Sequence, residues 1–297
     1  MVLMAVYCTH AVLMGAAVLV AGRRRVQWIL SAICLCFCFL LEWFAPVGSL
    51  SRAIMALGGV AALAGTITVA VSSIPRWSIG FRLLQIITFG YRIHAGRIRP
   101  VLSIRILGRL LVEATAIGTA WLLLRYFIDA PLSITVRASC RLLAGIVFIY
   151  AIAEFIADLI HFSFLASGTA MRPIHITPIA ARSLRNFWGK RWNRAVSGWL
   201  RRFIFSPLAN RRRPKLGLIC AFLVSAAMHA WLLLVAVGAS AALSMATFFC
   251  LQGMFILAED RFQVRGWLVP LGRVWTLTIL LATSPLFICP FLSLLHL

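Results

Sequence analysis

Long apolar runs recur along this chain and are separated by short polar segments. They cover about residues 1–21, 26–45, 53–74, 104–128, 140–165, 216–238, 240–258 and 268–296. A helix of about 20 apolar residues crosses the hydrocarbon core of a bilayer. The runs are continuous rather than alternating, which argues against a transmembrane barrel. The sequence therefore predicts an all-α fold, a polytopic bundle of about eight transmembrane helices.

The composition agrees with a membrane protein. Of the 297 residues, 62% are hydrophobic and only 12% are charged, which leaves too little polar surface for a soluble domain of this length. The net charge of +22 could indicate a nucleic-acid partner. The cations, however, lie in the loops between apolar runs, where positive-inside sorting places them. We therefore expect contact with anionic membrane lipids and no nucleic-acid partner.

Lys and Arg are distributed unevenly between alternate loops. One set includes a dense loop at 172–215, whereas the other set holds only Arg52, Arg137 and Arg141. This bias predicts that the basic loops are cytosolic and that both termini lie on the opposite side. No internal repeat or soluble segment interrupts the pattern. We expect one integral, multi-pass membrane domain over residues 1–297, in the endoplasmic reticulum if the source is eukaryotic.

Three stretches carry further structural expectations. Segments 81–99 and 198–208 mix large apolar side chains with arginines, which predicts helices that lie in the membrane interface. Pro285 and Pro290 fall inside the last apolar run and predict a kink there. Four of the six histidines (His10, His94, His175 and His296) lie near expected helix ends or in loops, and we expect them to be interfacial or solvated.

Acidic residues are rare in the spans, and three ionisable positions share one helix face. Glu154, Asp158 and His161 are spaced by four and three residues. A metal site would need more carboxylates, such as Glu259 and Asp260, and no Asp-rich repeat accompanies them. The eight cysteines form no C-x-x-C pair. We expect no metal and no permanently bound cofactor, and we expect the acids to pair with arginines of the cationic loops.

His229 lies inside an apolar run, thirteen residues beyond Leu216. At 1.5 Å per residue this places it roughly 20 Å from the start of its helix. An ionisable side chain at such a depth is costly and marks a functional position facing protein or water. A neutral imidazole can take up a proton at physiological pH. The alternative is a structural histidine bonded to a neighbouring helix, and position alone does not separate the two.

A block of aromatic and cationic residues precedes this run at 183–194, with the sequence SLRNFWGKRWNR. Its aromatic side chains suit an interface or a lined pocket. Its cations suit a phosphorylated or acidic ligand that arrives from the cytosol, or equally the anchoring of lipid headgroups. The positions that could bind such a ligand are Arg185, Trp188, Lys190, Arg191 and Trp192, and Asn193 follows them.

These two segments resemble a known family. SLRNFWGKRWNR at 183–194 is similar to the wax-synthase-type signature of relatives of the membrane-bound O-acyltransferase (MBOAT) superfamily. FLVSAAMHAW at 222–231 is similar to that family's second block, an apolar helix with one histidine. The resemblance covers about residues 170–260. Ala226 and Ala230 stand where the family often has Gly and an acidic residue, which leaves the acceptor open.

The resemblance implies an MBOAT-like fold and an acyl-CoA-dependent O-acyltransferase. Acyl-CoA would be a co-substrate, the acyl group could be as short as acetyl, and the acceptor would be a lipophilic hydroxyl compound: a long-chain alcohol, a sterol or a terpenoid natural product. By position, His229 would be the general base, and Asn193 would orient it or hydrogen-bond the thioester. Segment 181–205 would then enter the membrane as a protein-enclosed re-entrant piece.

Two other functions fit the same composition. A transporter or flippase for an amphipathic anion would use Glu154, Asp158 and the arginines as a polar pathway. A metal-dependent prenyl-transfer enzyme would use the carboxylates as ligands. Transport without covalent change would favour the first, and activity that survives EDTA would exclude the second.

Overall fold

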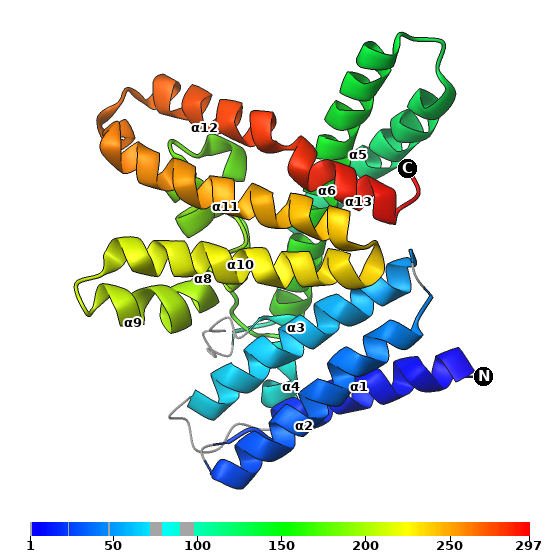
Figure 1. Cartoon of the computed structure of the whole chain (residues 1–297), viewed down its shortest axis with the longest axis vertical. Coiled ribbons are helices and arrows are strands. Elements are labelled where there is room, and N and C mark those ends of the chain that lie inside the picture. The colour runs from blue at the N-terminus through cyan, green and yellow to red at the C-terminus, as the bar shows by residue number, and fades with distance from the viewer. Residues whose placement is uncertain (1, 23, 47, 72–78, 90–97) are drawn as a thin grey trace. The chain divides into compact units, whose positions relative to one another are not determined.

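The computed structural model describes residues 2–22, 24–46, 48–71, 79–89 and 98–297 (Figure 1). Within these ranges the regular secondary structure is helical, and no strand is present. Seven helices are long and apolar enough to cross a membrane, and a bent pair can make an eighth. This confirms the predicted all-α bundle of about eight spans, and it makes the chain an integral membrane protein.

The chain forms two compact units that alternate along the sequence. Unit 1 comprises residues 1–91 and 198–253, and unit 2 comprises residues 92–197 and 254–297. Each unit therefore combines an earlier and a later part of the chain. A single domain over 1–297 remains a prediction.

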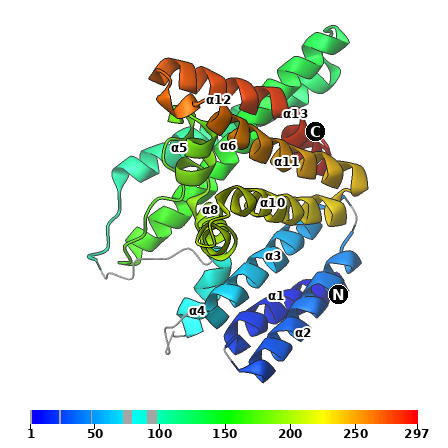
Figure 2. The ribbon, with the colours of Figure 1, turned by 60° about the vertical axis from the view of Figure 1, so that its left-hand side comes forward.

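Unit 1 is built around α3 (Leu50–Val71), which packs beside α1 (Val2–Val20) and α2 (Arg25–Leu41) (Figures 1 and 2). In α3, 67% of the spanning window is buried, far more than in α1 or α2. Its buried face is rich in small residues such as Ala56, Gly59 and Ala62. Small side chains let helix backbones approach closely, which is a main source of helix association in membranes.

The later part of unit 1 contains a helical hairpin. Its first arm runs from the end of α8 (Arg194–Leu200), of which residues 198–200 belong to this unit, through a π-helical turn (Arg201–Phe205) to α9 (Ser206–Ala209). α10 (Pro214–Ala236) forms the second arm. Proline at the first turn of α10 suits a helix start. A Cβ at Gly217 would lie 2.9 Å from the Phe205 carbonyl oxygen, so the backbones of the two arms approach each other closely at this point. α11 (Ala239–Arg261) follows.

The interfacial-helix predictions are met in part. The helix expected at 198–208 is present, and its location in the membrane interface remains a prediction. In segment 81–99, α4 (Ile79–Ile87) covers the first half, and residues 90–97 lie outside the described ranges.

Unit 2 contains the hairpin of α5 (Ile104–Asp129) and α6 (Ile134–Ala166), each capped by a serine hydroxyl at its start. α6 begins six residues before the apolar run predicted it, because the serine cap sets its start and the arginines in its first turns do not prevent a helix. α12 (Val269–Thr283) and α13 (Pro285–Leu294) meet at 45°. The predicted kink is therefore confirmed at Pro285, whereas Pro290 lies inside α13.

Candidate functional site

The signature block at 183–194 folds into a tight helical turn in unit 2. α7 (Leu184–Asn186) starts at Ser183, whose Oγ accepts a hydrogen bond from the backbone N–H of Asn186 at 3.0 Å. A π-helical turn, Phe187–Arg191, continues from α7. The free N–H groups of a helix start require acceptors, and this serine supplies one of them.

A buried carboxylate from α11 supplies the other acceptors at the start of the block. Glu259 accepts the backbone N–H of Leu184 at 2.5 Å and that of Arg185 at 3.1 Å. The indole N–H of Trp275 donates to the same carboxylate at 3.2 Å. Glu259 is 2% exposed, so these bonds compensate the loss of its hydration. The sequence suggested Glu259 only as a metal ligand. In the structure it holds the start of the block to α11 by accepting backbone N–H groups.

The cations of the block differ in what they contact. Arg185 forms an ion pair with Asp260. Arg191 donates to the Asn186 side-chain oxygen at 2.7 Å and to the carbonyl oxygens of residues 176 and 177. Lys190 is exposed and has no ion-pair partner in the parts of the chain that the structure describes. Both guanidinium groups therefore stabilise the turn, whereas the ammonium group of Lys190 is available to a ligand.

The aromatic residues of the block form a stack that sequence reasoning did not foresee. Trp192 stacks with His175 at 4.5 Å between ring centroids and with Phe187 at 5.6 Å, and Trp188 meets Phe187 edge-on. His175 is only 8% exposed, so the expectation that it is interfacial or solvated is wrong. The ring is buried because it lies against Trp192 and because its Nδ1 is 3.2 Å from Glu154 Oε1.

Asn193 occupies the junction between the block and α8. Its φ of +36° lies in the left-handed region, which Asn tolerates better than most residues. Its Oδ1 accepts the backbone N–H of Val196 at 3.2 Å and so caps α8. Its side-chain NH2 group has no hydrogen-bond partner among the described residues. Asn193 is half-buried and keeps a donor free.

The acidic face of α6 lies against an arginine of α5. Arg109 contacts Asp158 at 2.9 Å and Glu154 at 3.4 Å, and Glu113 one helical turn away at 3.8 Å. We expected Glu154 and Asp158 to pair with arginines of the cationic loops. This was wrong, because their arginine partner, Arg109, lies within the span α5. Arg109 and Glu113, an i,i+4 pair of charges within an apolar run, were the sequence signal for this cluster.

His229 lies on α10 in unit 1. Its Nδ1 is 2.8 Å from the Ser225 carbonyl oxygen, and its ring centroid is 4.2 Å from that of Phe249. A carbonyl oxygen only accepts hydrogen bonds, so Nδ1 carries the proton. Nε2 then has a free lone pair, and no partner contacts it within the described ranges. The hydrogen bond stays within the residue's own helix, unlike the bond to a neighbouring helix that a structural histidine was expected to make.

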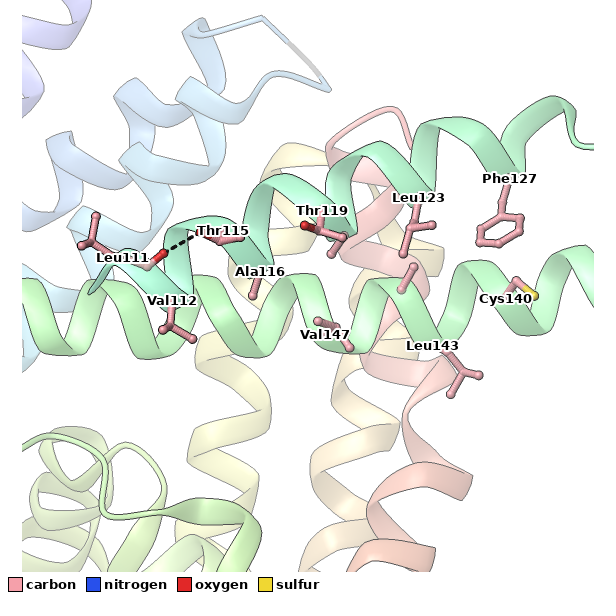
Figure 3. Close-up of a pocket in the computed structure, with 12 residues that line it drawn as sticks. Leu111, Val112, Thr115, Ala116, Thr119, Leu123, Phe127, Cys140, Leu143 and Val147 are labelled. Carbon is pink, nitrogen blue, oxygen red and sulfur yellow. Dashed lines mark hydrogen bonds between the residues drawn. The ribbon is translucent and has the colours of Figure 1, made fainter. Parts of the chain in front are cut away.

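A separate apolar pocket of about 800 Å³ lies between α5 and α6 (Figure 3). Its lining includes Leu111, Leu123, Phe127 and Leu143. None of the residues predicted to form the site lines it. A pocket of this composition suits a hydrocarbon chain, and Thr115, Thr119 and Cys140 are its only polar or thiol side chains among the lining residues.

The structure therefore places six predicted site residues in one short segment of unit 2, which extends from α7 to the start of α8: Arg185, Trp188, Lys190, Arg191, Trp192 and Asn193. His229 belongs to unit 1. The predicted entry of segment 181–205 into the membrane remains a prediction.

Comparison with known proteins links both segments to one family. Residues 171–251 match the Membrane bound O-acyl transferase family, and this range includes Asn193 and His229. Three Arabidopsis thaliana proteins are similar to the chain. "Probable long-chain-alcohol O-fatty-acyltransferase 3" is 31% identical over 142 residues, 43% of this chain and 42% of that protein. Proteins 2 and 7 of the same name are 30% identical over 109 residues and 27% identical over 145 residues.

The matches cover 32% of protein 2 and 43% of protein 7, so the chain spans less than half the length of the curated relatives that it matches. They nevertheless confirm the resemblance to wax-synthase-like membrane acyltransferases that the two sequence blocks indicated.

Proposed function

We propose that this chain is a membrane O-acyltransferase that transfers an acyl group from acyl-CoA to the hydroxyl of a lipophilic acceptor. A long-chain alcohol is the first acceptor to consider because the relatives' names contain it, and sterols and terpenoid alcohols follow. The observation that supports the proposal most is the range of the family match. It includes a histidine with a free Nε2 and an asparagine with a free NH2 group.

In this proposal His229 is the general base. Its Nε2 takes the proton of the acceptor hydroxyl while the oxygen attacks the thioester carbonyl carbon. The carbon–sulfur bond then breaks, and the thiolate of coenzyme A receives the proton from the imidazolium. The products are an ester and free coenzyme A, and the histidine returns to its neutral form. No covalent enzyme intermediate is required, because a thioester is already activated.

The remaining site residues would bind and orient the donor. The free NH2 group of Asn193 would donate to the thioester oxygen, where negative charge develops during attack. Lys190 would contact the phosphates of coenzyme A. Arg185, Arg191, Trp188 and Trp192 would give the turn its shape, and Arg185 and Arg191 would add positive charge near those phosphates.

The surroundings of the site contribute by excluding water. Apolar helices around a reacting thioester limit its hydrolysis, and they strengthen the electrostatic interactions that act on it. The proposal places the basic loops on the cytosolic side, in the endoplasmic reticulum membrane of a eukaryote, where the donor can reach them.

The test is product formation by the purified full chain in lipid nanodiscs. The donors are acetyl-CoA and palmitoyl-CoA, and the acceptors are 1-hexadecanol, cholesterol and geranylgeraniol. The proposal predicts an ester, identified by mass spectrometry, for at least one pair, together with stoichiometric release of coenzyme A. A protein that moves palmitoyl-CoA across proteoliposomes and forms no ester with any pair would be a transporter, and the proposal would be wrong.

A further inference from the structure

Glu42 is a wholly buried carboxylate in unit 1, with 0% of its surface exposed. It lies where α2 ends and a 3-10 turn (Glu42–Phe44) begins, within a span of the bundle. A buried acid in a membrane protein is costly unless it has partners, and such residues are usually retained for a function. The acyl-transfer chemistry proposed above does not use it.

The partner of Glu42 is a tryptophan on the helix of His229. The indole N–H of Trp231 donates to Glu42 Oε2 at 2.9 Å. The same ring meets Phe39 edge-on at 5.5 Å and Trp43 edge-on at 6.2 Å. Residues 39, 42 and 43 are spaced as i, i+3 and i+4, so they lie close together where α2 passes into the 3-10 turn. Together they form a socket for the indole, which we call the Trp231 socket.

Contacts from α3 make this socket rigid. Arg52, which is 3% exposed, donates to the backbone carbonyl oxygens of Glu42 and Trp43 at 3.0 Å each. Its guanidinium group also lies 5.1 Å from the centre of the Trp43 ring. Gly59 leaves no room for a side chain beside Glu42 Oε1, because an added Cβ would clash with that oxygen.

The second carboxylate oxygen faces α1. Glu42 Oε1 is 3.7 Å from Nε2 of His10, which is 2% exposed. His10 was expected to be interfacial or solvated, and this was wrong because it packs against the socket. Because the bond from the indole to Glu42 is enclosed in this way, breaking it leaves a buried polar group without a partner, which is costly.

The socket bears on His229 through helix geometry. Trp231 follows His229 by two residues, so the two side chains point roughly 200° apart around α10. With the indole fixed in the socket, the rotation of α10 about its own axis is fixed as well. The opposite face then presents the imidazole to Phe249 of α11 in one orientation.

We propose that Glu42 and Trp231 are positioning residues for the imidazole of His229. This inference rests on the proposed function, in which Nε2 of His229 takes the hydroxyl proton. Glu42 accepts the indole N–H, the indole sets the rotation of α10, and the rotation sets the direction of Nε2. A displacement of a catalytic group by about 1 Å can cost about a hundredfold in rate.

The main test is Trp231→Phe, which keeps an aromatic ring beside Phe39 and Trp43 and removes the N–H. We expect kcat with palmitoyl-CoA and 1-hexadecanol to fall about tenfold or more, while KM for palmitoyl-CoA changes less than about twofold. We expect the same fall in kcat for Glu42→Leu. Glu42→Gln keeps an oxygen acceptor and should retain most of the wild-type kcat.

The matched control is Trp199→Phe. Trp199 is also buried in unit 1 and donates its indole N–H to the Ala64 carbonyl oxygen at 3.2 Å. It does not lie on α10. Trp199→Phe, which removes this hydrogen bond, should lower the melting temperature as much as Trp231→Phe does and leave kcat unchanged. Equal losses of kcat in the two variants would reduce the socket to ordinary packing and overturn the inference.

Two further measurements separate this inference from the proposed function. In the His229→Ala background, Trp231→Phe should cause no further loss of residual turnover, because it acts through the histidine. Full turnover in His229→Ala alone would refute the base assignment. Independently of turnover, the labelling rate of His229→Cys by N-ethylmaleimide, followed by peptide mass spectrometry, should change about fivefold or more with Trp231→Phe and not with Trp199→Phe. An unchanged rate would overturn the positioning role.

Discussion

The signature block and the His229 segment of α10 are built in opposite ways. Most polar side chains of the block have partners: Ser183 accepts a backbone N–H, and Arg185 and Arg191 bind an acid and carbonyl oxygens. Glu259 of α11 accepts two further backbone N–H groups of the block. Around His229 the helix is apolar, and the imidazole makes one hydrogen bond within its own helix. The block is held by many specific contacts, whereas His229, the proposed base, is held by one hydrogen bond within its helix.

The difference suggests how the sequence pattern relates to chemistry. A conspicuous motif such as SLRNFWGKRWNR has many fixed residues because a tight turn needs many specific contacts. Among the described residues, the NH2 group of Asn193 and the ammonium group of Lys190 have no partner, and the proposal assigns them to the donor. The histidine belongs to a less specific pattern and still keeps a free Nε2.

The largest effect should come from Glu259→Ala. Two backbone N–H groups and the Trp275 indole lose their acceptor, and each unsatisfied buried donor costs about 1–3 kcal/mol. We expect segment 183–194 to become sensitive to limited proteolysis and turnover to be lost. Asp260→Asn is the control, because it removes only the more exposed pair with Arg185. Equal proteolysis and equal turnover in the two variants would contradict the role of Glu259 in holding the block.

Asn193 should show a smaller effect that depends on the substitution. Asn193→Asp keeps an oxygen to cap α8 and loses the NH2 donor, so the fold should persist while kcat falls about a hundredfold. Asn193→Ala loses both and should also lower the melting temperature. If Asn193→Asp turned over at the wild-type rate, Asn193 would be only a capping residue.

His175→Phe tests the stack around Trp192. The aromatic contact with Trp192 is retained, and the contact with Glu154 is removed. We expect the free energy of unfolding to fall by about 1–2 kcal/mol, measured by thermal or denaturant unfolding in detergent, with kcat little changed. A loss of kcat without a loss of stability would give His175 a direct part in the reaction.

Lys190→Ala should have the smallest effect. Lys190 is exposed, so its removal should leave stability unchanged. KM for palmitoyl-CoA should rise about threefold to tenfold, as expected for one solvent-accessible contact with a phosphate. Lys215→Ala removes an exposed cation in the first turn of α10 and provides the control. The same rise in both variants would point to a general electrostatic attraction rather than a contact made by the block.

Much of the fold could be predicted from the sequence, because apolar length determines the spans and Pro285 determines the bend. The contacts of the acidic residues could not. Glu42 and Glu259 bind groups far away in sequence, at Trp231 and Leu184, and no local pattern indicates such pairs. Burial of His10 and His175 was missed for the same reason. The candidate site residues were proposed from their positions in the sequence, and the roles of His229 and Asn193 from a resemblance; their partners became visible only in three dimensions.

The account depends most on His229 as the proton acceptor. The direct measurement is ester formation by the full chain carrying His229→Ala, with and without added imidazole, next to Met228→Ala as the control on the same helix. The account predicts a fall in kcat of about 10²–10⁴-fold for His229→Ala, partial recovery with imidazole, and near wild-type turnover for Met228→Ala. Near wild-type turnover by His229→Ala without imidazole would contradict it.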